Sequence, residues 1–122
     1  PSVAAFNRNG VRRTTPEQYA ANLEGIVKIL KTTGAKLVWA SSTPLRDSDK
    51  LCVHASEVPL YNAVAQRVMA THAIPVNDLY SLAAPEMKWL LSSDDCHCTD
   101  EGYRCLGQQV AAVIAKALEI NL

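Results

Sequence analysis

The feature that most restricts the fold is a run of apolar residues without polar interruption, Leu37-Val38-Trp39-Ala40. A strand with one face in water alternates apolar and polar side chains, whereas a continuous apolar run is typical of a strand covered on both faces. A second strand is predicted at 74–77, where Pro75 stands near the start, a position that strands tolerate. Together the two segments predict a parallel sheet buried between helices.

The stretch before the first strand carries the signals of an amphipathic helix. Thr15, Pro16 and Gln18 have the pattern of a capped helix start with a capping box, and Gly34 is typical of a helix end. Apolar residues follow the start at spacings of three and four, which predicts one buried stripe made of Tyr19, Leu23, Ile26, Val27 and Leu30.

Three further helical segments are predicted. One covers 59–72 between the strands, a short one lies within 79–92 with Trp89 as an expected anchor, and Thr99 is expected to cap a last, long helix. The inward residues expected on the first and last of these are Leu60, Val64, Val68 and Met69, and then Leu106, Val110, Val113, Ile114, Ala117 and Leu118.

The order helix–strand–helix–strand–helix favours a parallel sheet with right-handed crossovers. We therefore predict an α/β chain, a partial three-layer α/β/α flavodoxin-like unit with a short parallel sheet, at 14–122 after an irregular segment at 1–13. Two strands make a poor sheet, which a missing segment, a weak strand signal at 3–7 or a second copy of the chain could complete. Because an unpaired edge at 37–40 would be prone to aggregate, we predict a homodimer that pairs there.

Charge argues against two classes of partner. Twelve basic residues balance twelve acidic ones, so nucleic acid and an anionic membrane are not expected partners. No apolar run approaches the roughly 20 residues that a membrane-spanning helix needs. The sequence does not indicate a cellular location.

The most specific local feature is Asp94-x-x-His97, which follows the last strand and stands just before the last helix. In an open α/β sheet such a loop lies outside the carboxyl ends of the strands, where sites form. An aspartate three residues before a histidine can bind the ring Nδ1, which fixes the tautomer and leaves Nε2 as a general base. We therefore predict Asp94 and His97 as catalytic residues.

The same stretch resembles a known family. Asp94-x-x-His97-x-Thr99-x-x-Gly102-Tyr103 before an amphipathic helix is similar to the last motif block of the SGNH (GDSL-like) hydrolases. The segments 15–23, 34–44, 61–62 and 74–79 resemble the preceding helices and strands of that fold, so the resemblance covers about 14–120. It implies hydrolysis of a small ester by a serine nucleophile, with His97 as general base, Asp94 as its orienting partner and no cofactor.

The family's nucleophile motif is absent. None of the five glycines is followed by Asp-Ser, and Asn7 and Asn9 fit the family's oxyanion block poorly. The chain therefore resembles the C-terminal half of the fold, and we predict a truncated or inactive ester hydrolase; the alternative is a non-catalytic dimeric assembly or binding module. Three other serines, Ser41, Ser42 and Ser48, are interpreted as loop residues rather than nucleophiles.

Four cysteines leave two interpretations open, reduced and partly buried thiols or a disulfide between Cys52 and one of Cys96, Cys98 and Cys105. A zinc site made of Cys96, His97, Cys98 and Cys105 is a further alternative. The Cys-x-Cys spacing is tighter than the usual knuckle, and no second pair is well placed. We therefore predict no metal.

Overall fold

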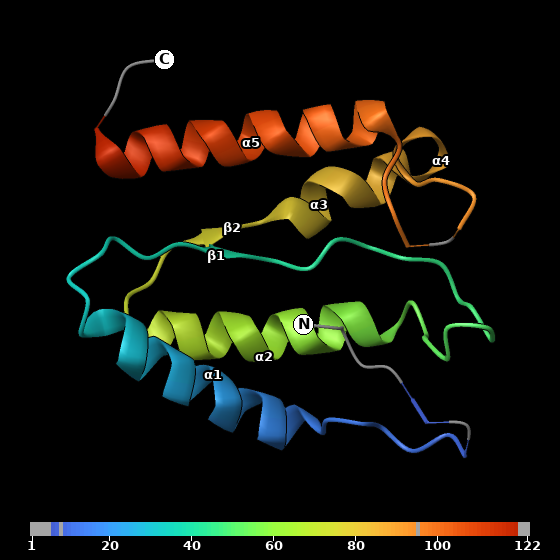
Figure 1. Cartoon of the computed structure of the whole chain (residues 1–122), viewed down its shortest axis with the longest axis horizontal. Helices are drawn as coiled ribbons and strands as arrows, with labels where there is room; N and C mark the ends of the chain where they lie inside the picture. The colour runs from blue at the N-terminus through green and yellow to red at the C-terminus, as the bar shows by residue number, and fades with distance from the viewer. Residues whose placement is uncertain (1–5, 8, 95, 120–122) are drawn as a thin grey trace.

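The fold is a short parallel sheet between two helical layers, seen in a computed structural model that describes residues 6–7, 9–94 and 96–119 (Figure 1). Along the chain the elements are α1 (Pro16–Lys31), β1 (Trp39–Ala40), α2 (Glu57–Thr71), β2 (Val76–Asn77), α3 (Leu79–Ala83), the 3-10 turn η1 (Ala84–Glu86), α4 (Met87–Leu90) and α5 (Asp100–Leu118). No helix among the described residues is long and apolar enough to cross a membrane.

The sheet is parallel, as predicted. β1 pairs with β2 in the register Trp39 to Val76 and Ala40 to Asn77. The strands are shorter than the predicted 37–40 and 74–77, and 37–39 is only half-buried, so the expectation of a strand covered on both faces is wrong in part. Among the described residues each strand has one partner strand, so the other edge of each strand is unpaired there.

The helices form the two outer layers that the α/β prediction requires (Figure 1). α1 and α2 pack together on one side of the strands, and α5 packs on α3 and α4 on the other. The core accordingly has two clusters. One is built from Leu23, Val27, Ala65, Val68, Met69 and Ile74, and the other from Leu79, Ala83, Leu90, Leu91 and Leu106.

The helix start at Thr15 is confirmed in atomic detail. The Thr15 hydroxyl accepts from the Gln18 backbone N–H at 3.2 Å, and the Gln18 side chain accepts from the Thr15 N–H at 2.9 Å. The helix ends at Lys31, and a turn follows in which Gly34 has φ +71°. Because the capping box joins residues only three apart, the local sequence was sufficient to predict it.

Several predicted inward side chains are exposed instead: Ile26 at 49%, Leu30 at 42%, Leu60 at 39%, Ile114 at 49%, Leu118 at 52% and the expected anchor Trp89 at 41%. Helical periodicity identifies an apolar stripe, but only a neighbouring layer buries it, and a two-stranded sheet covers a narrow part of each helix. The weak strand signal at 3–7 falls mainly outside the described residues. Within them, Phe6 makes one isolated antiparallel bridge to Arg12.

Candidate active site

The predicted catalytic residues lie on a loop that is closed at its base. After α4 the chain turns out and returns, and Leu91 and Cys98 form an antiparallel bridge. The Ser92 N–H donates to the His97 carbonyl at 2.8 Å, and the Thr99 N–H donates to the Leu90 carbonyl at 2.8 Å. These bonds hold the two ends of the loop in register.

The start of α5 anchors the loop on its other side. The Thr99 hydroxyl caps the helix by accepting from the Gly102 N–H at 3.0 Å, and it donates to the Trp89 carbonyl at 3.0 Å. At Gly102 a Cβ atom would lie 2.5 Å from the Leu90 carbonyl oxygen, so only glycine allows this approach. Thr99 and Gly102 of the sequence motif therefore dock α5 against the end of α4.

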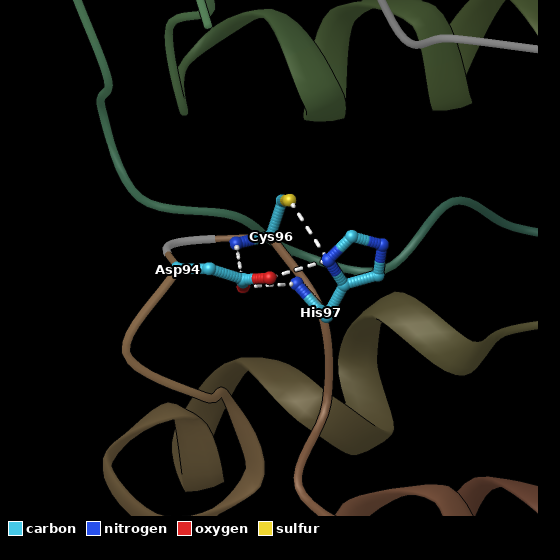
Figure 2. A group of neighbouring side chains, drawn as sticks. All are labelled: Asp94, Cys96 and His97. Atoms are coloured by element: carbon cyan, nitrogen blue, oxygen red, sulfur yellow. Dashed lines mark hydrogen bonds and ion pairs between the residues drawn. The ribbon is translucent and has the colours of Figure 1, made fainter. Parts of the chain in front are cut away.

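Asp94 and His97 contact each other directly (Figure 2). One carboxylate oxygen, Oδ2, lies 2.5 Å from the ring Nδ1 of His97. The other, Oδ1, accepts from the backbone N–H groups of His97 at 2.9 Å and Cys96 at 3.2 Å, and from the Ser92 hydroxyl at 2.7 Å. The carboxylate thus organises its own loop as well as the ring.

These donors hold the pKa of the Asp94 carboxyl well below its ordinary value. The largest cause is the His97 backbone N–H, followed by the Ser92 hydroxyl and the His97 ring. Because an ionised carboxylate can only accept, Nδ1 carries the shared proton and the lone pair of the neutral ring is on Nε2. Nε2 lies on the side of the ring away from Asp94 (Figure 2).

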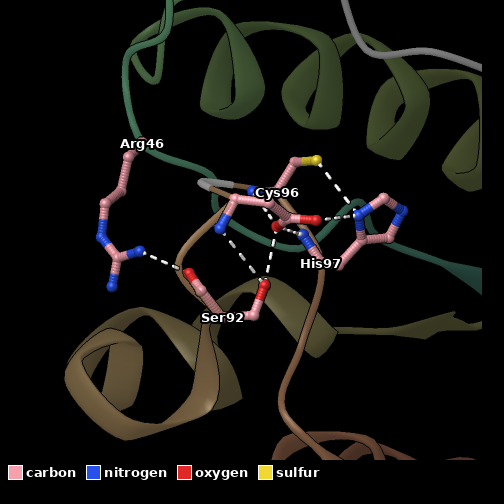
Figure 3. A network of polar contacts seen from close by, with 5 residues as sticks. Arg46, Ser92, Cys96 and His97 are labelled. Atoms are coloured by element: carbon pink, nitrogen blue, oxygen red, sulfur yellow. Dashed lines mark hydrogen bonds and ion pairs between the residues drawn. The ribbon is translucent and has the colours of Figure 1, made fainter.

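Arg46 supports the loop from a distant part of the chain. Its guanidinium donates to the Ser92 carbonyl at 2.9 Å (Figure 3). It also donates to the Met87 carbonyl at 3.2 Å. Sequence reasoning missed this residue because an arginine in a polar loop has no periodicity or spacing that connects it to carbonyls more than 40 positions away.

The loop after β1 and the Asp94–His97 loop face each other across a pocket of about 380 Å³. Its lining residues are Ser48, Lys50, Leu51, Ser93, Asp94, Cys96 and His97. The side chains of His97 and Asp94 are 69% and 49% exposed, respectively. The pair is therefore open to a ligand or to another protein segment.

The serines considered in the sequence have other contacts. Ser41 is buried, and its hydroxyl donates to Asp78 at 3.1 Å and accepts from the Tyr80 N–H at 2.9 Å, which fixes the start of α3. The Ser42 backbone is held by Asn62, and the Ser48 hydroxyl accepts from the Leu51 N–H at 3.3 Å. Among the described residues, no serine hydroxyl bonds to the His97 ring.

Cys96 also contacts the ring, with Sγ 3.5 Å from Nδ1. In a catalytic triad the nucleophile and the orienting carboxylate contact different nitrogens of the histidine ring. Here the thiol and the Asp94 carboxylate both contact Nδ1, so Cys96 does not have the position of a triad nucleophile. All four cysteines lie within the described residues, and none forms a disulfide there. The disulfide alternative therefore has no support in the structure.

The structure does not bring Cys96, His97, Cys98 and Cys105 together as one group of zinc ligands. Within the described part of the chain, the potential ligands that group together are Asp94, Cys96 and His97. Cys98 lies against Gly102 instead, and burial raises the pKa of its thiol, with the Asp94 charge as a smaller cause.

Comparison with known proteins identifies the fold. No protein-family model and no curated protein matches the chain. Among solved structures, it is similar to a lipase/acylhydrolase from Enterococcus faecalis, with 25% identity, a TM-score of 0.70, and coverage of 82% of this chain and 51% of that one.

Two further structures show the same fold at lower identity. The esterase domain of the ORF1 protein from the zebrafish ZfL2-1 retrotransposon has 13% identity and a TM-score of 0.70, with 88% of this chain and 62% of that one covered. A GDSL-like lipase from Bacteroides thetaiotaomicron has 16% identity and a TM-score of 0.62, with 84% and 54% covered. The chain spans about half the length of the structures it matches, and it has the fold of a partial SGNH (GDSL-like) hydrolase unit.

Proposed function

We propose that the chain supplies the general-base half of an ester-hydrolysing site, with His97 as the base and Asp94 as its orienting partner. The observation that carries the proposal is the 2.5 Å contact between Asp94 Oδ2 and His97 Nδ1, on a ring whose other nitrogen points away from the carboxylate. The fold of the matched structures, which include a lipase/acylhydrolase and an esterase domain, supports ester hydrolysis as the reaction class.

In this reaction Nε2 takes the proton of a serine hydroxyl as that oxygen attacks the ester carbonyl, and later returns it to the leaving alcohol. Asp94 keeps Nδ1 protonated and stabilises the imidazolium that forms. The Ser92 hydroxyl and the backbone N–H groups of Cys96 and His97 also donate to the carboxylate. These bonds keep the carboxylate in place while it orients the imidazole.

The nucleophile in this proposal is contributed by residues outside the printed sequence. No Gly-Asp-Ser motif is present, and the described serine hydroxyls do not bond to the His97 ring. Without a nucleophile the rate of ester hydrolysis falls by several orders of magnitude. We therefore expect no covalent adduct when the chain is treated with a fluorophosphonate, and a single adduct that depends on His97 would contradict an external nucleophile.

The general base has a direct test in the ring nitrogens. Two-bond ¹H–¹⁵N NMR of the neutral side chains should show His97 protonated on Nδ1, and Asp94→Asn should change its tautomer balance. His72 is the internal control, because its Nε2 contacts Glu24 at 2.6 Å and should carry the proton in both proteins. His97 protonated on Nε2 in the wild type would overturn the proposal.

A second candidate is a non-catalytic homodimer, favoured by one observation at the sheet edge. The N–H groups of Trp39 and Ser41 donate to the carbonyls of Pro75, just before β2, and Asn77, at its end. The Ala40 N–H between them therefore points to the opposite edge. No described strand pairs with that edge. We propose that β1 of a second copy pairs there.

Sedimentation equilibrium at micromolar concentrations should then give the mass of a dimer. Ala40→Pro, which removes the edge donor, should convert the dimer to a monomer. Val76→Pro is the matched control, because it removes a donor from the outer edge of β2. A wild-type protein that stays monomeric across this range excludes the dimer.

A further inference from the structure

We propose that three side chains, the Asp94 carboxylate, the Cys96 thiolate and Nδ1 of the His97 ring, bind a divalent transition-metal cation, with Zn²⁺ as the representative ion. Metal binding stands on the loop geometry alone. Its consequence for catalysis, which is inhibition, rests on the proposed general-base function. This set differs from the four-residue zinc alternative based on the sequence, because Asp94 replaces Cys98 and Cys105.

The positions of the ligand atoms carry the inference. One atom from each side chain lies within 4.8 Å of the others, and all three face one another (Figure 2). In tetrahedral zinc sites the Zn–N and Zn–S bonds of about 2.0 and 2.3 Å place nitrogen and sulfur about 3.5 Å apart. The Sγ of Cys96 and Nδ1 of His97 already have this separation, 3.5 Å.

The carboxylate must move away from the ring to share an ion with it. Oδ2 lies 2.5 Å from Nδ1 in the structure. Oxygen and nitrogen ligands of one zinc ion lie about 3.3 Å apart, so Oδ2 must move back by less than about 1 Å. Oδ1 keeps its backbone donors during this movement, since it is the other oxygen that turns towards the ion.

The two ends of the loop are held in place before any ion binds. The Leu91–Cys98 bridge closes its base, and the Arg46 guanidinium holds the Ser92 carbonyl (Figure 3). Three protein ligands leave one tetrahedral position open, and the pocket of about 380 Å³ beside it has room for water or a small anion.

Binding at Nδ1 reverses the tautomer of His97. The Cys96 thiol releases its proton to solvent, and the Nδ1 proton is lost while the neutral ring takes one at Nε2. Nε2 then donates a hydrogen bond and has no lone pair for a substrate hydroxyl. The zinc-bound loop therefore lacks the general base, and release of the ion restores it.

The test is a calorimetric titration of the whole chain with zinc chloride in a buffer that keeps thiols reduced. We expect one ion per chain, at least tenfold weaker binding in Cys96→Ala, and unchanged binding in Cys105→Ala, whose cysteine is on α5. The NMR signals of His97 should show the proton moved to Nε2, while His72 is unchanged. Absence of binding, equal binding by Cys96→Ala, or zinc binding that leaves every ring signal of His97 unperturbed would each overturn the site.

The two proposals fail separately. If zinc binding depends on Cys96 but the metal-free His97 is protonated on Nε2, the metal site stands and the general-base proposal fails. If the metal-free His97 is protonated on Nδ1 but the chain does not bind zinc, the general-base proposal stands and the metal site fails.

Discussion

Gly102→Ala is expected to destabilise the protein by about 2–3 kcal/mol, measured by urea unfolding. The added Cβ would lie 2.5 Å from the Leu90 carbonyl oxygen and 3.1 Å from the Leu90 side chain. The nearest atom belongs to the backbone, so relief requires α5 to move away from α4. That movement also displaces Thr99, whose N–H donates to the same carbonyl.

Gly107→Ala is the matched control, because it makes the same change in the same helix. Nothing lies within 4 Å of the Cβ position at Gly107. Alanine there should stabilise the helix by about 0.5–1 kcal/mol, since glycine loses more backbone entropy on folding. Equal effects of the two substitutions would show that the approach of α5 to Leu90 does not contribute to stability.

Leu90→Ala is expected to lower the free energy of unfolding by about 3 kcal/mol and to loosen first the half of the fold that carries the Asp94–His97 loop. The Leu90 side chain is fully buried in the cluster formed with Leu79, Ala83, Leu91 and Leu106. The main helix partners of α5 are α3 and α4, so a cavity at Leu90 weakens the attachment of α5. Hydrogen exchange should show lower protection of the α5 amides, with smaller changes in α1 and α2.

Met69→Ala provides the comparison in the other cluster. Met69 is 2% exposed and packs with Leu23, Val27 and Val68 between α1 and α2. Met69→Ala is expected to lower the free energy of unfolding by a similar amount. Hydrogen exchange should then show lower protection of the amides in α1 and α2. If both variants lower the protection of every helix equally, the two clusters form a single cooperative unit.

Much of the site loop could be predicted because its contacts are local. Asp94 and His97 are three residues apart, and the carboxylate that binds the ring also accepts from the backbone between them. The Thr99 cap and the Thr15 capping box have the same short range. Such contacts depend on residue type and spacing, which are visible in the sequence.

The supporting contacts come from distant residues and were not predictable. Arg46 reaches Ser92 and Met87 from the loop after β1. Ser41 follows a strand, as a nucleophile could, but packing against Asp78 and Tyr80 assigns it a structural role. Gly102 belongs to a recognisable motif, yet the reason for glycine is the position of the Leu90 carbonyl.

The order of helices and strands, the parallel pairing and the Asp94–His97 pair follow from the amino-acid sequence alone, because periodicity, capping and short spacing define them. The tertiary structure determines which apolar side chains are buried, since Ile26, Leu60 and Ile114 have the right spacing but no layer above them. It also decided which ring nitrogen of His97 contacts Asp94 and that Cys96 contacts the same one, because those distances depend on how the loop is closed and held.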